Sequence, residues 1–465
     1  MNAPLLWVVV PLASGLLLML LSSHQRIMKL TALLICLLLG LVALLIPINS
    51  MIIFGSQTSL VFTDSLNILG RQLILGRNQQ PLLIFLFMLA AFWILASLTV
   101  RTHRFQISVL MMQTGLSIGM ISVRPLSFSI YFILLLTILP MPILQVQRES
   151  DSSGLMRTML SQILGVTFIG VAFWLMNAVS LNIADTMLTQ RTILMMLIGF
   201  IFLLGIFPFH SWLVMLMMRY PSFSVGFTVS LQQFSVFYLL LKILNEYTWI
   251  RTYNELYRGM VAIGLVMLLF GGLMALFSTF PKRLFAALVL AENGIVLVAI
   301  GMKSERELTA AMTLLVLRLL VTLVWAYIDQ TESDAQQAHA EALLQGEDPP
   351  PSLIDLSAVR LLVYYILAGM PLSLAFPEKI ALLSSLSTIS PRNSFLLGTG
   401  MLLLLVSGVH LYRRLLAGNA SIPTKKKFSP GILIAVLLLL ALGVFATFVK
   451  SGIALLLAPF NAILS

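Results

Sequence analysis

Five ionisable side chains lie in or beside long apolar stretches of the sequence. They are His210, Glu292, Arg318 and the neighbours Glu378 and Lys379. Ionisable groups at bilayer depth are costly, and they usually pair with one another or line ion pathways. A buried lysine changes its protonation state readily, so Lys379 is the strongest candidate for ion handling. The structural alternative is that Glu292 and Arg318 simply pair between helices and that His210 bonds a backbone carbonyl.

Other kinds of chemistry find no support in the residues. The chain has no Gly-rich phosphate loop, no His-Glu-x-x-His pair and no defensible Ser, His and Asp grouping. Its five histidines are dispersed, and the single Cys36 excludes a disulfide framework, a cysteine zinc site or an iron–sulfur cluster held by this chain alone. We therefore predict no catalytic residues, no cofactor and no metal. The net charge of +11 is scattered between apolar stretches, which argues against nucleic-acid binding.

The composition indicates an all-α integral membrane protein. Of the 465 residues, 59% are hydrophobic and only 10% are charged, whereas soluble domains carry about 25% charged residues. Helices that cross a bilayer need roughly 20 apolar residues each. Fourteen such spans are predicted, at 5–22, 28–48, 81–100, 105–122, 125–146, 158–180, 192–208, 222–244, 256–279, 284–302, 308–328, 358–389, 394–412 and 428–449.

Two of these spans contain helix breakers. The segment Ile206–Leu213 ends the seventh span with Pro208, and Leu367–Ser373 interrupts the twelfth with Gly369 and Pro371. Proline removes a helical hydrogen bond and clashes with the preceding turn. Irregular backbone at membrane depth is tolerated only inside protein or beside a water-filled cavity. These breaks therefore indicate either transport sites or simple packing kinks.

Charged segments outside the spans suggest the orientation and a contact surface. No basic residue precedes the first span, whereas Arg26 and Lys29 follow it, so we expect a retained first helix with its N-terminus outside a bacterial inner membrane. The segment Asp329 to Asp355 carries seven acidic residues and no Lys or Arg. It is interpreted as a solvated connecting loop or as a docking surface for a basic partner.

Four ordered motifs carry a family resemblance. The segment Phe207–Leu213 resembles the Pro-Leu-His-x-Trp-Leu signature of the antiporter-like subunits of respiratory complex I, of Mrp sodium/proton antiporters and of energy-converting hydrogenases. The other matches are Phe280–Ala287 to Lys-Arg-Leu-x-Ala-Tyr, Ala291–Ile295 to Glu-Asn-x-Gly-Ile, and Leu367–Pro371 with Phe376 and Lys379 to the broken twelfth helix. The resemblance covers roughly residues 81–390.

The resemblance implies two inverted five-helix repeats, each with one broken helix. It divides the chain into N-terminal helices 1–100, a first repeat 105–244, a second repeat 256–390 containing the acidic loop 329–356, and C-terminal helices 394–465. It also implies that Arg318 and Lys379 occupy family positions for ion translocation. Lys282, in the segment that matches Lys-Arg-Leu-x-Ala-Tyr, is a further candidate. Three further family positions are apolar here, at Leu135, Leu203 and Phe234. The resemblance therefore implies a degenerate first half. In the second half, the guanidinium of Arg318 is a poor proton relay.

These observations favour an antiporter-like membrane subunit of a larger energy-converting complex, which supports proton or cation translocation among other membrane subunits. The alternative is a non-conducting structural or docking subunit, for example in an inorganic-carbon uptake assembly. A stand-alone transporter would show ion-coupled uptake without partners. A lipid-modifying membrane transferase would need carboxylates or histidines clustered at one membrane face, and the sequence shows none.

Overall fold

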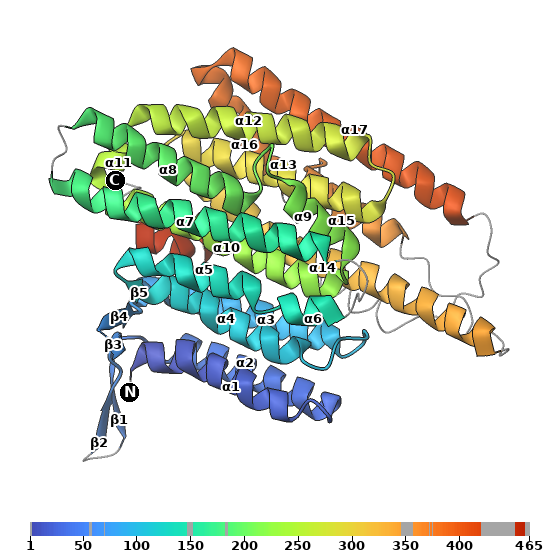
Figure 1. The fold of residues 1–465 in the computed structure, drawn as a ribbon, viewed down its shortest axis with the longest axis horizontal. Coiled ribbons are helices and arrows are strands. Elements are labelled where there is room, and N and C mark those ends of the chain that lie inside the picture. The colour runs from blue at the N-terminus through green and yellow to red at the C-terminus, as the bar shows by residue number, and fades with distance from the viewer. Residues whose placement is uncertain are drawn as a thin grey trace.

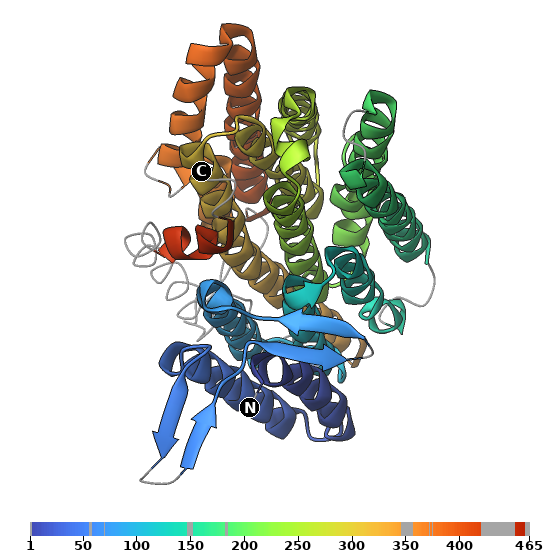
Figure 2. The same ribbon diagram turned by 90° about the vertical axis from the view of Figure 1, so that its left-hand side faces the viewer.

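The computed structural model is a bundle of long helices that run side by side (Figure 1). It describes residues 2–54, 58–68, 70–146, 152–181, 185–345, 357–371, 373, 375–419 and 452–460. Figure 2 views the same helices end on, with the N-terminal helices α1 and α2 at one edge of the bundle and α16 and α17 toward the opposite edge.

The α-helices are α1 (Val10–Leu20), α2 (Gln25–Leu45), α3 (Gln80–Ser97), α4 (Gln106–Ser122), α5 (Ser129–Ile138), α6 (Met141–Val146), α7 (Ser153–Leu181), α8 (Thr186–Leu204), α9 (Ser211–Arg219), α10 (Ser222–Glu246), α11 (Thr248–Thr252), α12 (Asn254–Leu276), α13 (Pro281–Gly301), α14 (Glu305–Gln345), α15 (Ser357–Ala368), α16 (Ala375–Ile389) and α17 (Pro391–Asn419). The π-helix η1 (Leu5–Val9) precedes α1, and short 3₁₀ helices lie at η2 (Arg77–Gln79), η3 (Leu126–Phe128) and η4 (Ala458–Phe460).

The predicted spans agree with these helices. Thirteen of the fourteen lie on helices, and the fourteenth, 428–449, falls outside the described residues. Within the described ranges, ten helical segments are long and apolar enough to cross a membrane. The all-α membrane fold and its broken helices are thereby confirmed, while the number fourteen stays a prediction.

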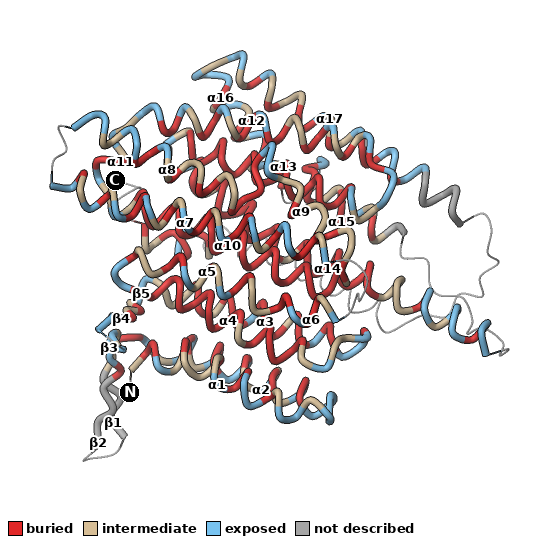
Figure 3. Tube along the Cα trace, viewed as in Figure 1, coloured by how far each residue is buried: buried red, intermediate tan, exposed pale blue. Residues whose placement is uncertain are grey.

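Burial places α10 and α13 at the centre of the bundle (Figure 3). The apolar stretches of both helices are buried along their whole length, whereas less than half of the corresponding stretch of α2 or α7 is buried. A helix that is apolar all round and buried all round belongs in the interior of a bundle. The side chains of α10 and α13 are therefore the ones best shielded from lipid and water.

Two small antiparallel sheets, which the sequence analysis did not predict, lie at one end of the bundle (Figure 1). One pairs β1 (Met51–Phe54) with β2 (Thr58–Val61), and the other has the order β3 (Ser65–Ile68), β4 (Arg71–Ile74), β5 (Val123–Arg124). The N-terminus lies at the same end, because Ala3 N donates to Thr63 O at 2.8 Å.

The acidic segment corrects one expectation. Residues Asp329–Gln345, predicted as part of a loop, continue α14 as helix, while 346–356 lie outside the described residues. The helix persists because its acidic side chains have basic partners within the chain: Arg360 pairs with Asp329 and Glu332, and Arg101 pairs with Glu341. Paired carboxylates can lie along a helix, so a solvated loop is not required.

Candidate functional site

The break between α15 and α16 presents a helix end to a lysine. The four C-terminal carbonyls of a helix lack partners within it. Gly369 turns the chain with φ of +86°, and the amides of Gly369 and Met370 both donate to Tyr365 O at 3.1 Å. The carbonyl of Leu367 instead accepts a 2.6 Å hydrogen bond from Lys379 Nζ. The partial negative charge at a helix C-terminus stabilises such a cation.

Lys379 also forms an ion pair with Glu292 of α13. Both side chains are almost completely buried, and the Lys379 ammonium contacts Glu292 Oε1. The second carboxylate oxygen, Oε2, has no hydrogen-bond partner among the described residues. A buried charge pair is stable only with good geometry and satisfied lone pairs. The free oxygen can therefore accept a further hydrogen bond from a group that enters the site.

Arg318 is the third charge in the same region, and its direct partner is an amide. Its guanidinium donates to Asn293 Oδ1, and the Asn293 amide donates to Leu204 O of α8 at 3.3 Å. The direct pair of Arg318 with Glu292, which was the structural alternative, does not form: the arginine contacts Asn293 and the glutamate contacts Lys379. Asn293 connects the charged region to the broken helix of the N-terminal half.

The break between α8 and α9 has neutral partners instead. Gly205 turns the chain with φ of +66°. The carbonyl of Leu203 accepts from Gln232 Nε2 at 3.1 Å and from Gln162 Nε2 at 3.5 Å. That of Phe202 accepts from the indole of Trp212 at 3.2 Å. Amide and indole groups do not change charge, so these two carbonyls have no charged donor like Lys379, and the one histidine at this break, His210, packs against aromatic rings.

The three family positions that are apolar in this chain also contribute no charge near the α8–α9 break. Leu203 and Phe234 are buried within the bundle, and the side chain of Leu135 is 53% exposed on its outside. None of the three brings a charge into the N-terminal half.

A buried lysine in the N-terminal half was missed in the sequence analysis. Lys242 lies in α10, is 7% exposed, and donates from Nζ to Ile121 O at 2.6 Å near the C-terminus of α4. It occurs alone within the apolar run Val236–Leu244. An ionisable residue alone in an apolar run is the signal that identified Glu292 and Arg318, and it would have found Lys242 as well.

Two of the predicted site residues lie apart from the charged centre. His210, at the start of α9, packs against Phe270 with ring centroids 4.6 Å apart and against Phe207 with centroids 6.0 Å apart. Glu378 is half-buried next to Lys379, and the ion pair of that lysine is with Glu292. The structure therefore brings together Glu292, Arg318 and Lys379 out of the six predicted residues.

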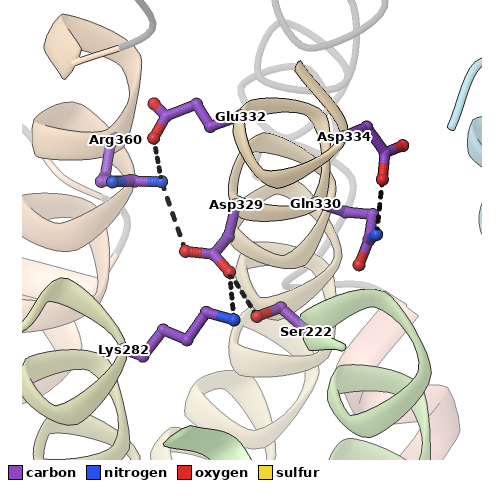
Figure 4. Close-up of polar contacts among 7 residues, drawn as sticks. All are labelled: Ser222, Lys282, Asp329, Gln330, Glu332, Asp334 and Arg360. Carbon is purple, nitrogen blue, oxygen red and sulfur yellow. Dashed lines mark hydrogen bonds and ion pairs between the residues drawn. The ribbon is translucent and has the colours of Figure 1, made fainter. Parts of the chain in front are cut away.

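Lys282 belongs to a second group of charges at the end of the bundle where α13 begins (Figure 4). Its Nζ lies 3.2 Å from Asp329 Oδ2, which also accepts from the Ser222 hydroxyl. Arg360 NH2 lies 3.3 Å from Asp329 Oδ1 and 2.7 Å from Glu332 Oε2. We call these five residues the Asp329 cluster. The sequence analysis missed Asp329 as a site residue because it was assigned to a loop. Its partner Arg360 was missed with it.

Metal binding finds no support in the described ranges, where no three His, Cys, Asp or Glu side chains lie close enough to hold an ion. The chemistry available is that of amines, carboxylates and amides buried in a helical membrane bundle. Such groups can hold, exchange and relay protons or accompany a small cation.

The fold and the buried pair define a class of protein: a multi-pass membrane bundle with charged side chains at a broken helix. Residues 128–407 match the family described as "NADH:quinone oxidoreductase/Mrp antiporter, TM". Because this match spans more than half of the sequence, the chain belongs to that family of membrane subunits.

Individual relatives agree with this assignment. NADH-quinone oxidoreductase subunit N of Francisella tularensis is 27% identical over 212 residues, which cover 44% of this chain and 41% of the relative. The chain spans about half the length of the curated relatives it matches. Among solved structures, the archaeal membrane-bound sulfane sulfur reductase matches with a TM-score of 0.76 at 14% identity, covering 99% and 98% of the two chains. Respiratory complex I of Thermus thermophilus matches with a TM-score of 0.71 at 14% identity, covering 99% and 100%.

Proposed function

We propose that this chain is a membrane subunit of a multisubunit energy-converting complex and that it supports proton or cation translocation through its C-terminal half. The observation that carries the proposal is the buried pair of Lys379 and Glu292 at the α15–α16 break. A lysine held between a carboxylate and a helix C-terminus can release its proton and regain it when either partner moves. The family membership and the names of the relatives support the same reading.

The N-terminal half supports this function less well. Its broken helix is capped by neutral amides and an indole, and Leu135, Leu203 and Phe234 bring no charge to this half. We therefore propose that ion movement depends chiefly on the C-terminal half. These same features favour the second candidate, a subunit that fills its place in the complex without conducting.

The experiment that separates the two functions is proton flux across liposomes that hold the purified host complex. Lys379→Ala is compared with Lys303→Ala, because Lys303 lies at the protein surface between α13 and α14 and pairs weakly with Asn254 at 3.5 Å. We expect Lys379→Ala to reduce flux several-fold with unchanged assembly and Lys303→Ala to leave it intact. Unchanged flux in Lys379→Ala would identify the chain as a non-conducting subunit.

Localisation and docking complete the proposal. We propose a bacterial plasma membrane with the N-terminus outside, as the charges around the first helix suggest. We also propose that a basic partner docks on the acidic segment. Its surface is smaller than the sequence suggests, because Asp329, Asp334 and Glu341 already have partners in this chain.

A further inference from the structure

The Asp329 cluster fastens four helices together at one end of the bundle (Figure 4). Ser222 comes from α10, Lys282 from α13, Asp329 and Glu332 from α14, and Arg360 from α15. Asp329 is 6% exposed and has a hydroxyl and two cations as partners. Charge-assisted hydrogen bonds of this kind fix geometry more strongly than neutral ones do.

Arg360 is the first of three buried anchors on one face of α15. Arg360, Tyr364 and Leu367 are spaced four and three residues apart, which places them on the same side of a helix. The Tyr364 hydroxyl lies 2.5 Å from Ser407 Oγ and donates to Leu404 O of α17 at 3.1 Å. Leu367 O accepts from Lys379. The helix is therefore held at its start, its middle and its end.

These anchors connect the Asp329 cluster to the buried ion pair. Arg360 and Leu367 are seven residues apart, or about 10 Å along the helix axis. Among the described residues, Arg360 contacts Asp329, Glu332 and Trp325, so its influence on Lys379 is transmitted through α15. A helix moves as a rigid rod, and a slide or rotation of α15 at its start displaces Leu367 O at its end. Lys379 would then keep only its bond to Glu292. Arg360 packs 5.5 Å from the ring centroid of Trp325 in α14, which further restricts such a movement.

We propose that Arg360 and Asp329 are positioning residues, which hold α15 in the register that presents the Leu367 carbonyl to Lys379. This inference rests on the proposed function in one respect: Lys379 is taken to be the exchanging group. The cluster lies at the end of the bundle, so it offers a place from which a neighbouring subunit can alter the environment of Lys379 without touching it.

The structural part of the test is hydrogen–deuterium exchange of backbone amides 366–370 in the host complex reconstituted in nanodiscs. Arg360→Met removes the donors and keeps an unbranched, flexible side chain. Glu332→Gln weakens one partner of Arg360 and is used if the first variant does not assemble. Arg258→Met is the control, since Arg258 is exposed and pairs only locally with Glu255 among the described residues. We expect exchange to accelerate about tenfold in Arg360→Met, less in Glu332→Gln, and not in the control.

The functional part is the pH profile of proton flux. Arg360→Met is expected to lower flux and to shift its pH dependence, because displacement of the Leu367 carbonyl removes one of the two acceptors that hold the Lys379 ammonium. Arg360→Lys keeps a cation and is expected to restore the wild-type profile.

Unchanged exchange at 366–370 in both Arg360→Met and Glu332→Gln would overturn the positioning role. Unchanged flux in Lys379→Ala would overturn the proposed function alone, because the exchange experiment still decides whether Arg360 positions α15.

Discussion

At the scale of residues, the central feature is one ion pair shared between α13 and α16. Buried pairs add little net stability compared with apolar side chains of similar size, yet removing one partner strands a charge. A buried ion pair that adds little stability is therefore expected where its charges serve function. Stability and transport can therefore be separated by experiment at Glu292 and Lys379.

We predict that Glu292→Leu and Lys379→Met each destabilise the subunit by about 3 kcal/mol, because each leaves a buried charge alone. The double variant is expected to recover most of that stability, since its two side chains pack without charge, while flux stays low. The measurement is a double-mutant cycle of thermal unfolding of the purified complex, run beside liposome flux. Additive destabilisation would show that the pair is not coupled, and full flux in the double variant would remove it from the transport route.

At the scale of elements, the position of Glu292 depends on how closely α13 approaches α12. Gly264 of α12 and Gly294 of α13 face each other, and a Cβ on Gly264 would lie 2.5 Å from Gly294 O. Small residues allow membrane helices to approach at backbone distance. Gly294 is two residues from Glu292, so the distance between α12 and α13 determines where the Glu292 carboxylate lies within the bundle.

We predict that Gly264→Val forces α12 and α13 apart and lowers both thermal stability and proton flux. Gly259→Val is the matched control, because it lies in the same helix and a Cβ there meets nothing within 4 Å. We expect a loss of a few kcal/mol in the first variant, as for overpacked cores, and only a small propensity effect in the second. Equal stability of the two variants would contradict the close approach of the helices.

The elements also show what the sequence could and could not predict. Pro208 and Pro371 revealed both helix breaks, because proline interrupts hydrogen bonding whatever its surroundings. The continuation of α14 beyond Asp329 was missed, since it depends on partners distant in sequence: Arg360, and Arg101 for Glu341. Local composition distinguishes a charged helix from a loop poorly when tertiary ion pairs decide between them.

At the scale of the whole molecule, the two halves of the chain cap their broken helices with different side chains. Each has a helix that ends inside the bundle at a left-handed glycine, Gly205 or Gly369. One end is capped by amides and an indole, and the other by Lys379. The apolar residues Leu135, Leu203 and Phe234 of the first half could be read from the sequence, whereas the buried Lys242 of the same half was missed. The sequence did not predict that Asn293 would bridge the two halves, because that contact depends on how α8 and α13 pack.

The orientation of the molecule is open to a direct test, since the two ends of the bundle are distinct. Gln80, at the start of α3, donates to Ala43 O near the sheets, whereas Arg101, beyond the end of α3, contacts Glu341 of α14. The sheets and the α14 extension therefore lie at opposite ends. Asn67 and Gln337 are exposed markers of these two ends.

We predict that Asn67→Cys reacts with a membrane-impermeant maleimide in intact cells, and that Gln337→Cys reacts only after the membrane is permeabilised, because basic residues after the first helix favour an outside N-terminus. The single native Cys36 is fully buried and serves as an internal negative control. The measurement is gel-shift labelling of the affinity-purified subunit. The opposite pattern would place the N-terminus inside, and the Asp329 cluster would then face the exterior, where partners docked on the cytoplasmic side cannot reach it.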